Sequence, residues 1–184
     1  MIPVANVRKL YNYIEFSFLL CYIIETELIQ LEIKTGYLYH IKDEFFKLIN
    51  DKELMINHEN GHSRPSYLAI KDNDLLWFIP LSTKIDKYQK IIEKKEKKYG
   101  KCKSIIIRKI AGVEEAILIQ NAFPILEKYI KSVHTIDGRI IRVSTHLQKE
   151  ILDDFKYMLS LKKNGRDLFF TDIDRIKEIL DNMV

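Results

Sequence analysis

Residues 62–88 read HSRPSYLAIKDNDLLWFIPLSTKIDKY, and this stretch decides the fold. Two apolar runs, residues 65–71 and 75–81, flank the segment Asp72-Asn73-Asp74. Asp and Asn favour tight turns, so the pattern predicts a β-hairpin. Nearly continuous apolar runs are typical of strands buried on both faces, or of the wall of a small barrel. We therefore expect a buried hairpin.

Polar side chains stand at one end of this hairpin. Arg64 precedes the first strand, and Ser82, Thr83 and Lys84 follow the second. Antiparallel pairing brings these two ends together. An arginine fork, a hydroxyl and a lysine suit a phosphodiester, and alternation points only one of the two hydroxyls to a given face. The competing interpretation is structural: Ser82 or Thr83 simply begins the following helix.

A lysine-rich segment follows at once. Residues 84–109 hold 11 Lys or Arg and 3 acidic residues, a local net charge of +8 in a chain whose total is +4. Lys87, Lys90 and Lys94 recur on one face of a predicted helix that ends at Gly100. Such a stripe is either the footprint of a nucleic-acid partner or a solvated helix face.

The remaining pattern predicts one α+β domain, a strongly bent antiparallel sheet with helices laid on it. Further strands are expected at residues 32–41, 104–109, 115–119, 133–136 and 139–143, and a loop at 57–63. Further helices are expected at residues 43–50, 124–131 and 144–161, and from Thr171 or Asp172 to residue 183.

Length and composition limit the class of protein to which the chain can belong. A chain of 184 residues that is 47% apolar and 30% charged suits one ordinary domain with a real core. The two cysteines, Cys21 and Cys102, form neither a metal-binding spacing nor a disulfide framework, so a cytoplasmic location is expected. Residues 1–30 are predicted to be a helical extension. Its apolar run, residues 16–24, is too short to cross a bilayer, and one hypothesis starts the natural domain, residues 31–184, at Leu31.

Histidines and tyrosines near the hairpin add candidates. His62 is a candidate proton shuttle near neutral pH, as is Lys84 if its pKa is depressed. His40 ends the strand predicted at residues 32–41 and would approach the same edge. Tyr37 and Tyr39 either stack on bases or fill the core.

RNA is a substrate that needs few protein groups. Its own 2′-hydroxyl can attack the neighbouring phosphate, so the protein has to hold the phosphate, stabilise its growing charge and move protons. Arg64 and Lys84 are the candidates for charge, and Ser82 or Thr83 for orientation. The sequence contains no Walker loop, zinc-ligand spacing or nucleophile elbow, and no cofactor or metal is expected.

Four segments together resemble the endoribonuclease toxins of type III toxin–antitoxin systems, the ToxN/AbiQ group, and most closely its CptN/TenpN-like branch. They are residues 36–46 (GYLYHIKDEFF), 64–67 (RPSY), 77–88 (WFIPLSTKIDKY) and 118–125 (LIQNAFPI), in that order. The resemblance implies an SH3-like barrel related to the MazF/PemK toxins, with added helices. It also implies metal-independent, sequence-selective RNA cleavage that leaves a 2′,3′-cyclic phosphate, with catalysis by Arg64 and the Ser82-Thr83-Lys84 turn. Many relatives carry serine as the second hydroxyl, where this chain has Thr83.

The resemblance implies partners as well. They are a cellular or phage mRNA substrate and a small pseudoknot-like RNA antitoxin, which the toxin cuts from a repeat transcript and which inhibits it in a closed ring. The candidate RNA contacts are Tyr37, Tyr39, His40, Lys42, Lys87, Lys90 and Lys94. The alternative function is a non-catalytic RNA-binding module that uses the same lysine-rich helix.

Overall fold

The computed structural model describes residues 33–55, 57–59 and 62–183, and the following concerns the unit that starts at Lys34. The extension predicted at residues 1–30 lies outside the described residues. The strands are β1 (Leu38–Ile41), β2 (His58–Glu59), β3 (His62–Ser63), β4 (Ser66–Asp72), β5 (Leu75–Ser82), β6 (Ile106–Ile110), β7 (Val113–Ile117), β8 (Phe123–Leu126), β9 (Ile130–Val133), β10 (Thr135–Ile136) and β11 (Arg139–Ile140). The α-helices are α2 (Asp43–Ile49), α3 (Ile85–Tyr99), α4 (Thr145–Lys163) and α5 (Ile173–Asp181), and 3₁₀ turns cover η1 (Ile119–Asn121) and η2 (Glu127–Tyr129).

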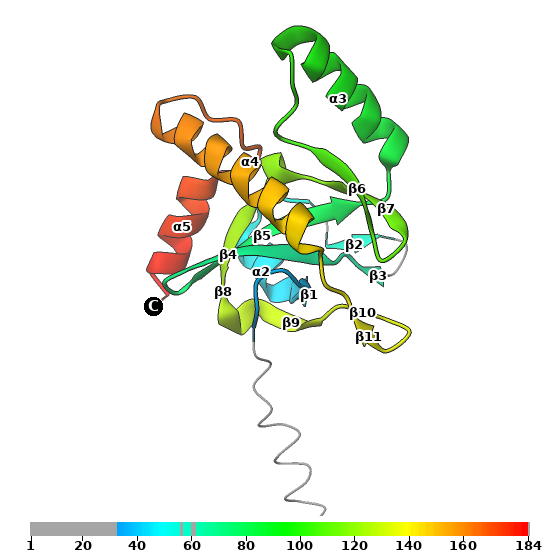
Figure 1. Ribbon diagram of the computed structural model, residues 1–184. Coiled ribbons are helices and arrows are strands. Elements are labelled where there is room, and N and C mark those ends of the chain that lie inside the picture. Colours follow the sequence, from blue (N-terminus) through cyan, green and yellow to red (C-terminus); the bar gives the residue numbers. More distant parts are fainter. Residues whose placement is uncertain (1–32, 56, 60–61, 184) are drawn as a thin grey trace, which may run out of the picture. The chain divides into compact units, whose positions relative to one another are not determined.

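The strand β5 is the centre of the sheet (Figure 1). Seven described strands form an antiparallel sheet with the order β6-β7-β5-β4-β1-β9, and β8 also pairs with β5. One edge of β5 carries β4 from Leu75 to Pro80. The other edge carries β8 along its first half and β7 at Leu81 and Ser82. Every β5 side chain from Leu76 to Ser82 is buried, which confirms the prediction of a strand buried on both faces.

The expected barrel is not confirmed. Among the described strands the pairing is an open path whose ends are β6 and β9, and no pairing between them closes the sheet. The α+β class with an antiparallel sheet and packed helices is confirmed. Within the described part of the chain, no helix is long and apolar enough to cross a membrane.

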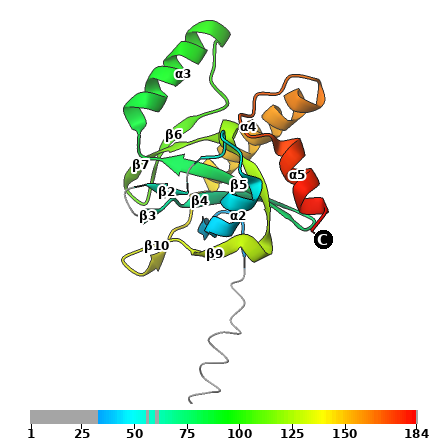
Figure 2. The ribbon, with the colours of Figure 1, turned by 180° about the vertical axis from the view of Figure 1, so that it is seen from behind.

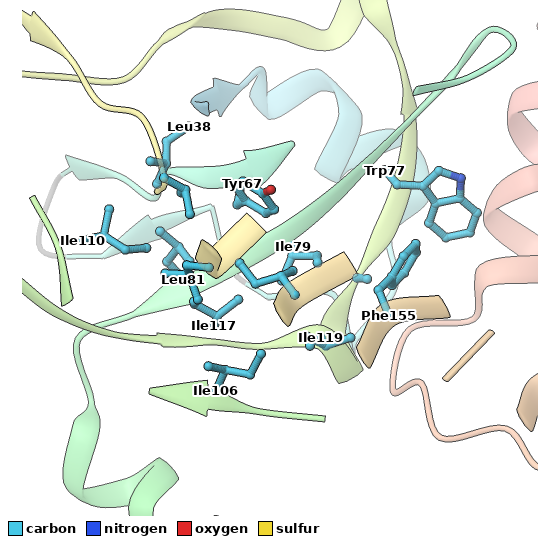
Figure 3. Close-up of a cluster of buried hydrophobic side chains, with 14 of the residues drawn as sticks. Leu38, Tyr67, Trp77, Ile79, Leu81, Ile106, Ile110, Ile117, Ile119 and Phe155 are labelled. Carbon is cyan, nitrogen blue, oxygen red and sulfur yellow. The ribbon is translucent and has the colours of Figure 1, made fainter. Parts of the chain in front are cut away.

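The helix α4 covers one face of the sheet (Figure 1). Ser144 begins it by accepting a hydrogen bond from the Leu147 N–H at 3.4 Å, the cap that the sequence predicts. Its apolar stripe enters the largest core cluster, where Phe155 meets the edge of Trp77 at 5.4 Å and packs near Ile79 (Figure 3). The burial of this stripe fixes α4 across β4 and β5.

The helix α2 covers the opposite face (Figure 2). Its Phe45 ring stacks on Phe123 of β8 at 5.5 Å, and Phe123 stacks on Phe78 of β5 at 6.5 Å. The sheet is thus packed on both sides, by α4 on one face and by α2 on the other.

Three segments differ from the sequence predictions. The strand expected at residues 32–41 begins only at Leu38, because Gly36 makes a turn at φ +89° that favours glycine. The helix expected at residues 124–131 is wrong: β8 and β9 occupy it, since β8 pairs with the buried edge of β5 and this pairing overrides the local pattern. The loop expected at residues 57–63 contains the small hairpin of β2 and β3.

Candidate functional site

The end of β5 lies beside the start of β4. Ser66 pairs with Pro80, so Arg64 comes level with Ser82 when the register is continued by two residues. Thr83 then leads into α3. In Figure 1 this end of the sheet lies on the right, where β5 terminates near β2 and β3. The register therefore brings Arg64 and the turn after β5 to the same end of the sheet.

The two hydroxyls of this turn lie in different environments. Ser82 is 4% exposed, and its Oγ accepts a hydrogen bond from the Lys84 N–H at 3.3 Å. Thr83 is exposed, and its carbonyl accepts from the Ile85 N–H at 2.9 Å. No side chain caps the first turn of α3. Ser82 thus shapes the turn, and Thr83 is the hydroxyl that a ligand can reach.

Arg64 is held by a network of neighbouring segments. Its N–H donates to the Asn57 carbonyl at 2.6 Å, and its Nη1 lies 3.5 Å from Met55 Sδ. The Asn57 amide in turn donates to the Ile41 carbonyl at 3.0 Å and to Asp43 Oδ1 at 2.6 Å. The hydrogen bond from Asn57 is the main reason that the pKa of the Asp43 carboxyl lies below its usual value. The segment before Arg64 is therefore anchored to both β1 and α2.

Glu115 is a titratable group that the sequence analysis did not assign to this site. Ser82 pairs with Ala116 of β7, so Glu115 comes level with Thr83 on the other edge of β5. Burial raises the pKa of the half-buried Glu115 carboxyl to about 7, and the positive charge of Arg64 acts against this rise. A carboxyl that titrates near neutrality can accept and return a proton at physiological pH.

A chain of hydrogen bonds joins two histidines beside Arg64. His40 Nδ1 lies 2.7 Å from Ser63 Oγ, and His40 Nε2 lies 2.9 Å from His134 Nδ1. Burial is the main cause that lowers the pKa of both imidazoles, and for His40 the charges of His134 and Lys131 lower it further. The lowered pKa values favour the neutral form of both rings. Two arrangements of protons satisfy the chain: Ser63 donates to His40 and His40 donates to His134, or His134 donates to His40 and His40 donates to Ser63.

The predicted RNA contacts on β1 fall into different environments. Tyr39 is 2% exposed, meets Phe78 edge-on, and its hydroxyl donates to the Lys34 carbonyl at 3.0 Å. The prediction that it stacks on a base is therefore corrected, because the ring is part of the core. Tyr37 is half-buried with the Arg142 guanidinium 5.7 Å from its ring centre, and Lys42 is half-buried between β1 and α2.

The other predicted contacts lie on β3 and α3. The backbone of His62 pairs with Glu59, and the His62 side chain lies outside the described residues. Lys87, Lys90 and Lys94 are exposed on α3, and the burial of Tyr88 anchors the same helix against β7 and its neighbours. The lysine face is therefore solvated and starts directly after Thr83 and Lys84.

Comparisons with known proteins give likenesses to solved structures but no match in sequence. No protein-family model matches the chain, and no curated protein matches its sequence. Among solved structures the chain is similar to AbiQ, a lactococcal anti-phage endoribonuclease belonging to the type III toxin–antitoxin system. The match has a TM-score of 0.45 and 15% identity, and covers 81% of this chain and 80% of that one. At this identity and TM-score the likeness assigns neither a family nor a residue role.

Proposed function

We propose that the protein is a metal-independent, sequence-selective endoribonuclease toxin of a type III toxin–antitoxin system. The observation that carries the proposal is the meeting of Arg64, Thr83 and Glu115 at the strand ends around Ser82. These groups supply a forked cation, an accessible hydroxyl and a carboxyl with a pKa of about 7. In cleavage by the 2′-hydroxyl of RNA, such groups can stabilise the charge on the phosphate, orient it and accept the proton of the 2′-hydroxyl. The sequence motifs around them resemble that toxin group, in the order given above.

The cations of this site would stabilise the reacting phosphate. Charge grows on the non-bridging oxygens as the 2′-oxygen attacks phosphorus and the bond to the 5′-oxygen breaks. The planar fork of Arg64 can donate two hydrogen bonds to those oxygens, and Thr83 can add one. Lys84 adds a positive charge at the start of α3. The products are a 2′,3′-cyclic phosphate and a free 5′-hydroxyl.

Two proton transfers complete the reaction. Glu115 in its ionised form accepts the proton of the 2′-hydroxyl, and Lys84 or His62 returns a proton to the leaving 5′-oxygen. The raised pKa of Glu115 makes it a stronger base than an ordinary carboxylate while leaving a substantial ionised fraction near pH 7.

The first test is direct. Incubation of the purified protein with RNA in EDTA is expected to give discrete cuts that end in a 2′,3′-cyclic phosphate. Thr83→Ala is expected to slow cleavage by about tenfold to a hundredfold, because one hydrogen-bond donor to the transition state is lost. Ser82→Ala is the matched control, since this hydroxyl is buried and bonded to the backbone. Uncut RNA, or an equal loss in both variants, would sink the assignment of Thr83.

The proposed partners are an mRNA substrate and a small structured RNA antitoxin that the protein processes and that holds it in a ring. The exposed face formed by Lys87, Lys90 and Lys94 suits contact with an RNA backbone. Changing all three residues to Gln is expected to reduce the slope of log K against log salt by about 2, since each lost contact with single-stranded RNA releases about 0.7 fewer counterions. Filter binding between low and moderate salt measures this slope. An unchanged slope would show that these three lysines do not contact the RNA.

A non-catalytic RNA-binding module is the second candidate, and the same exposed lysine face favours it. The EDTA incubation separates the two functions. Retention of RNA on the protein without cuts would support the binding module and exclude the endoribonuclease.

A further inference from the structure

A cavity lies away from the strand-end site, where the last turns of α3 and α4 approach the segment before α5. Its volume is about 470 Å³, within the range of small-molecule sites. Lys95 on its wall is 11 residues beyond Lys84, so the two are about 16 Å apart along α3. The cavity therefore belongs to a different surface from the turn at Ser82.

The cavity gathers exposed rings. Tyr99 is 61% exposed, Phe170 50% and Tyr157 40%, and all three line it. A cluster of exposed rings, unlike rings scattered singly over a surface, is typical of an interaction site. Rings around a cavity offer stacking surfaces to a planar aromatic ligand.

The same wall carries positive charge. Lys95, Lys101, Lys103 and Arg166 line the cavity, and Asp167 is its one carboxylate among the described residues. Asp167 forms an ion pair with Lys162, which does not line the cavity, and so it does not neutralise any of the four cations that do. Lys103 pairs with Asp154 of α4. Within the described part of the chain, no carboxylate lies at ion-pair distance from Lys95, Lys101 or Arg166.

Lys95 shows that these cations are more than solubilising charges. It is half-buried, and its Nζ donates to Ser104 Oγ at 2.6 Å and to Gln120 Oε1 at 2.7 Å, both neutral acceptors. It also lies 5.9 Å from the centre of the Phe170 ring. Burial lowers its pKa, which is the mark of an ammonium group removed from water without a counter-charge. Lysines near the C-terminus of a helix often interact with its last carbonyl groups. Lys95 instead donates its hydrogen bonds to Ser104 and Gln120, which lie outside α3.

We propose that this cavity is a binding site for a nucleoside phosphate, whose base stacks on Phe170, Tyr99 or Tyr157 and whose phosphate meets Lys95, Lys101 and Arg166. Charge and rings occur together here, and this combination distinguishes a nucleotide from a simple anion and from an apolar ligand. The ligand is either a free nucleotide or one nucleotide extruded from an RNA strand, because both present the same chemistry. The proposal does not depend on RNA cleavage at the strand-end site.

Cys102 provides a local reporter, because it lines the cavity and is a half-buried free thiol. The experiment uses the full chain with Cys21→Ser, so that Cys102 is the one thiol that reacts. Alkylation by iodoacetamide is followed with AMP, adenosine, inorganic phosphate or a short oligoribonucleotide. AMP is expected to protect Cys102 better than adenosine or phosphate alone. Stronger protection of Cys102 by the oligoribonucleotide than by AMP would show that the ligand is a nucleotide within an RNA strand. Stronger protection by AMP would show that it is a free nucleotide.

Two variants test the roles of charge and ring by calorimetry with AMP. Lys95→Gln and Phe170→Ala are each expected to weaken binding by about tenfold, through loss of a charge-assisted hydrogen bond and of a stacking surface. Phe170 is half-exposed, so its removal leaves folding intact if the Lys95 variant does not fold. Lys97→Gln removes the same charge from an exposed position on α3 and is expected to bind as the parent does.

The proposal is overturned if neither AMP nor the oligoribonucleotide protects Cys102, if phosphate protects as well as AMP, or if Lys97→Gln weakens binding as much as Lys95→Gln. None of these outcomes depends on RNA cuts, so failure here and failure of the proposed endoribonuclease are distinguishable.

Discussion

Replacing Arg64 with alanine is expected to slow RNA cleavage by about a hundredfold to a thousandfold, the usual cost of losing a preorganised donor to a developing oxyanion. A large effect is expected because the Arg64 backbone is held through Asn57 to β1 and α2, and its Nη1 lies 3.5 Å from Met55 Sδ, which restricts the side chain before the phosphate arrives. Single-turnover cleavage of a labelled RNA in EDTA measures the rate.

Arg64→Lys is the matched variant for this prediction. It keeps the charge and loses the fork, so we expect a loss of about tenfold, between the parent and the alanine variant. Unfolding in urea checks that both variants remain folded. A separate measurement of RNA affinity distinguishes a loss of RNA binding from a slower cleavage step. A parental rate in Arg64→Ala would exclude this residue from the reaction.

Replacing Glu115 with glutamine is expected to lower cleavage and raise stability at the same time. Loss of the base is expected to slow the reaction by about a hundredfold or more, and to remove the rise in rate that the parent shows as pH increases through about 7. A rate that keeps its pH profile in Glu115→Gln would contradict the assignment.

The stability effect follows from the direction of the pKa shift. The folded protein holds a proton on Glu115 up to about pH 7, whereas the unfolded chain releases it near the ordinary glutamate pKa of 4.5. The folded state therefore binds more protons in this window, and its stability falls as pH rises through it. With allowance for partial solvation, Glu115→Gln is expected to raise the free energy of unfolding at pH 8 by about 1 to 3 kcal/mol, with little change at pH 4.

Glu114→Gln is the control for both measurements. Glu114 is the exposed neighbour on β7, and its side chain points to the other face of the strand. Urea unfolding at pH 4 and pH 8 and the cleavage rate are expected to match the parent. An equal gain in stability in Glu114→Gln would mean that net charge, and not burial of Glu115, causes the effect.

The sequence predicts the parts of this fold that local patterns determine. The hairpin of β4 and β5, the cap at Ser144 and the buried stripe of α4 follow from turn formers and periodicity. Residues 124–131 were misassigned because Pro124 and the residues after it suit a short helix. Their actual conformation depends on β5, whose residues are about 50 positions earlier in the chain.

The site was predictable only where its residues are close in sequence. Arg64 and the Ser82-Thr83-Lys84 turn flank one hairpin, so their approach follows from the hairpin itself. Glu115 joins them only because β7 pairs with the last residues of β5. His134 likewise meets His40 from 94 residues away. Both contacts depend on strand order, which composition and periodicity do not reveal.

The edge of β5 that pairs with both β7 and β8 has a consequence for the order in which the site forms during synthesis. Chain growth supplies β4 and β5 first, but β7 and β8, which complete the other edge of β5, follow only after Gly112. A chain that ends before Glu115 thus contains Arg64, before β4, and Thr83, after β5, but not the carboxyl that is proposed as the base. In the proposed endoribonuclease, the complete set of reacting groups would therefore form only after β7 has been synthesised and has paired with β5.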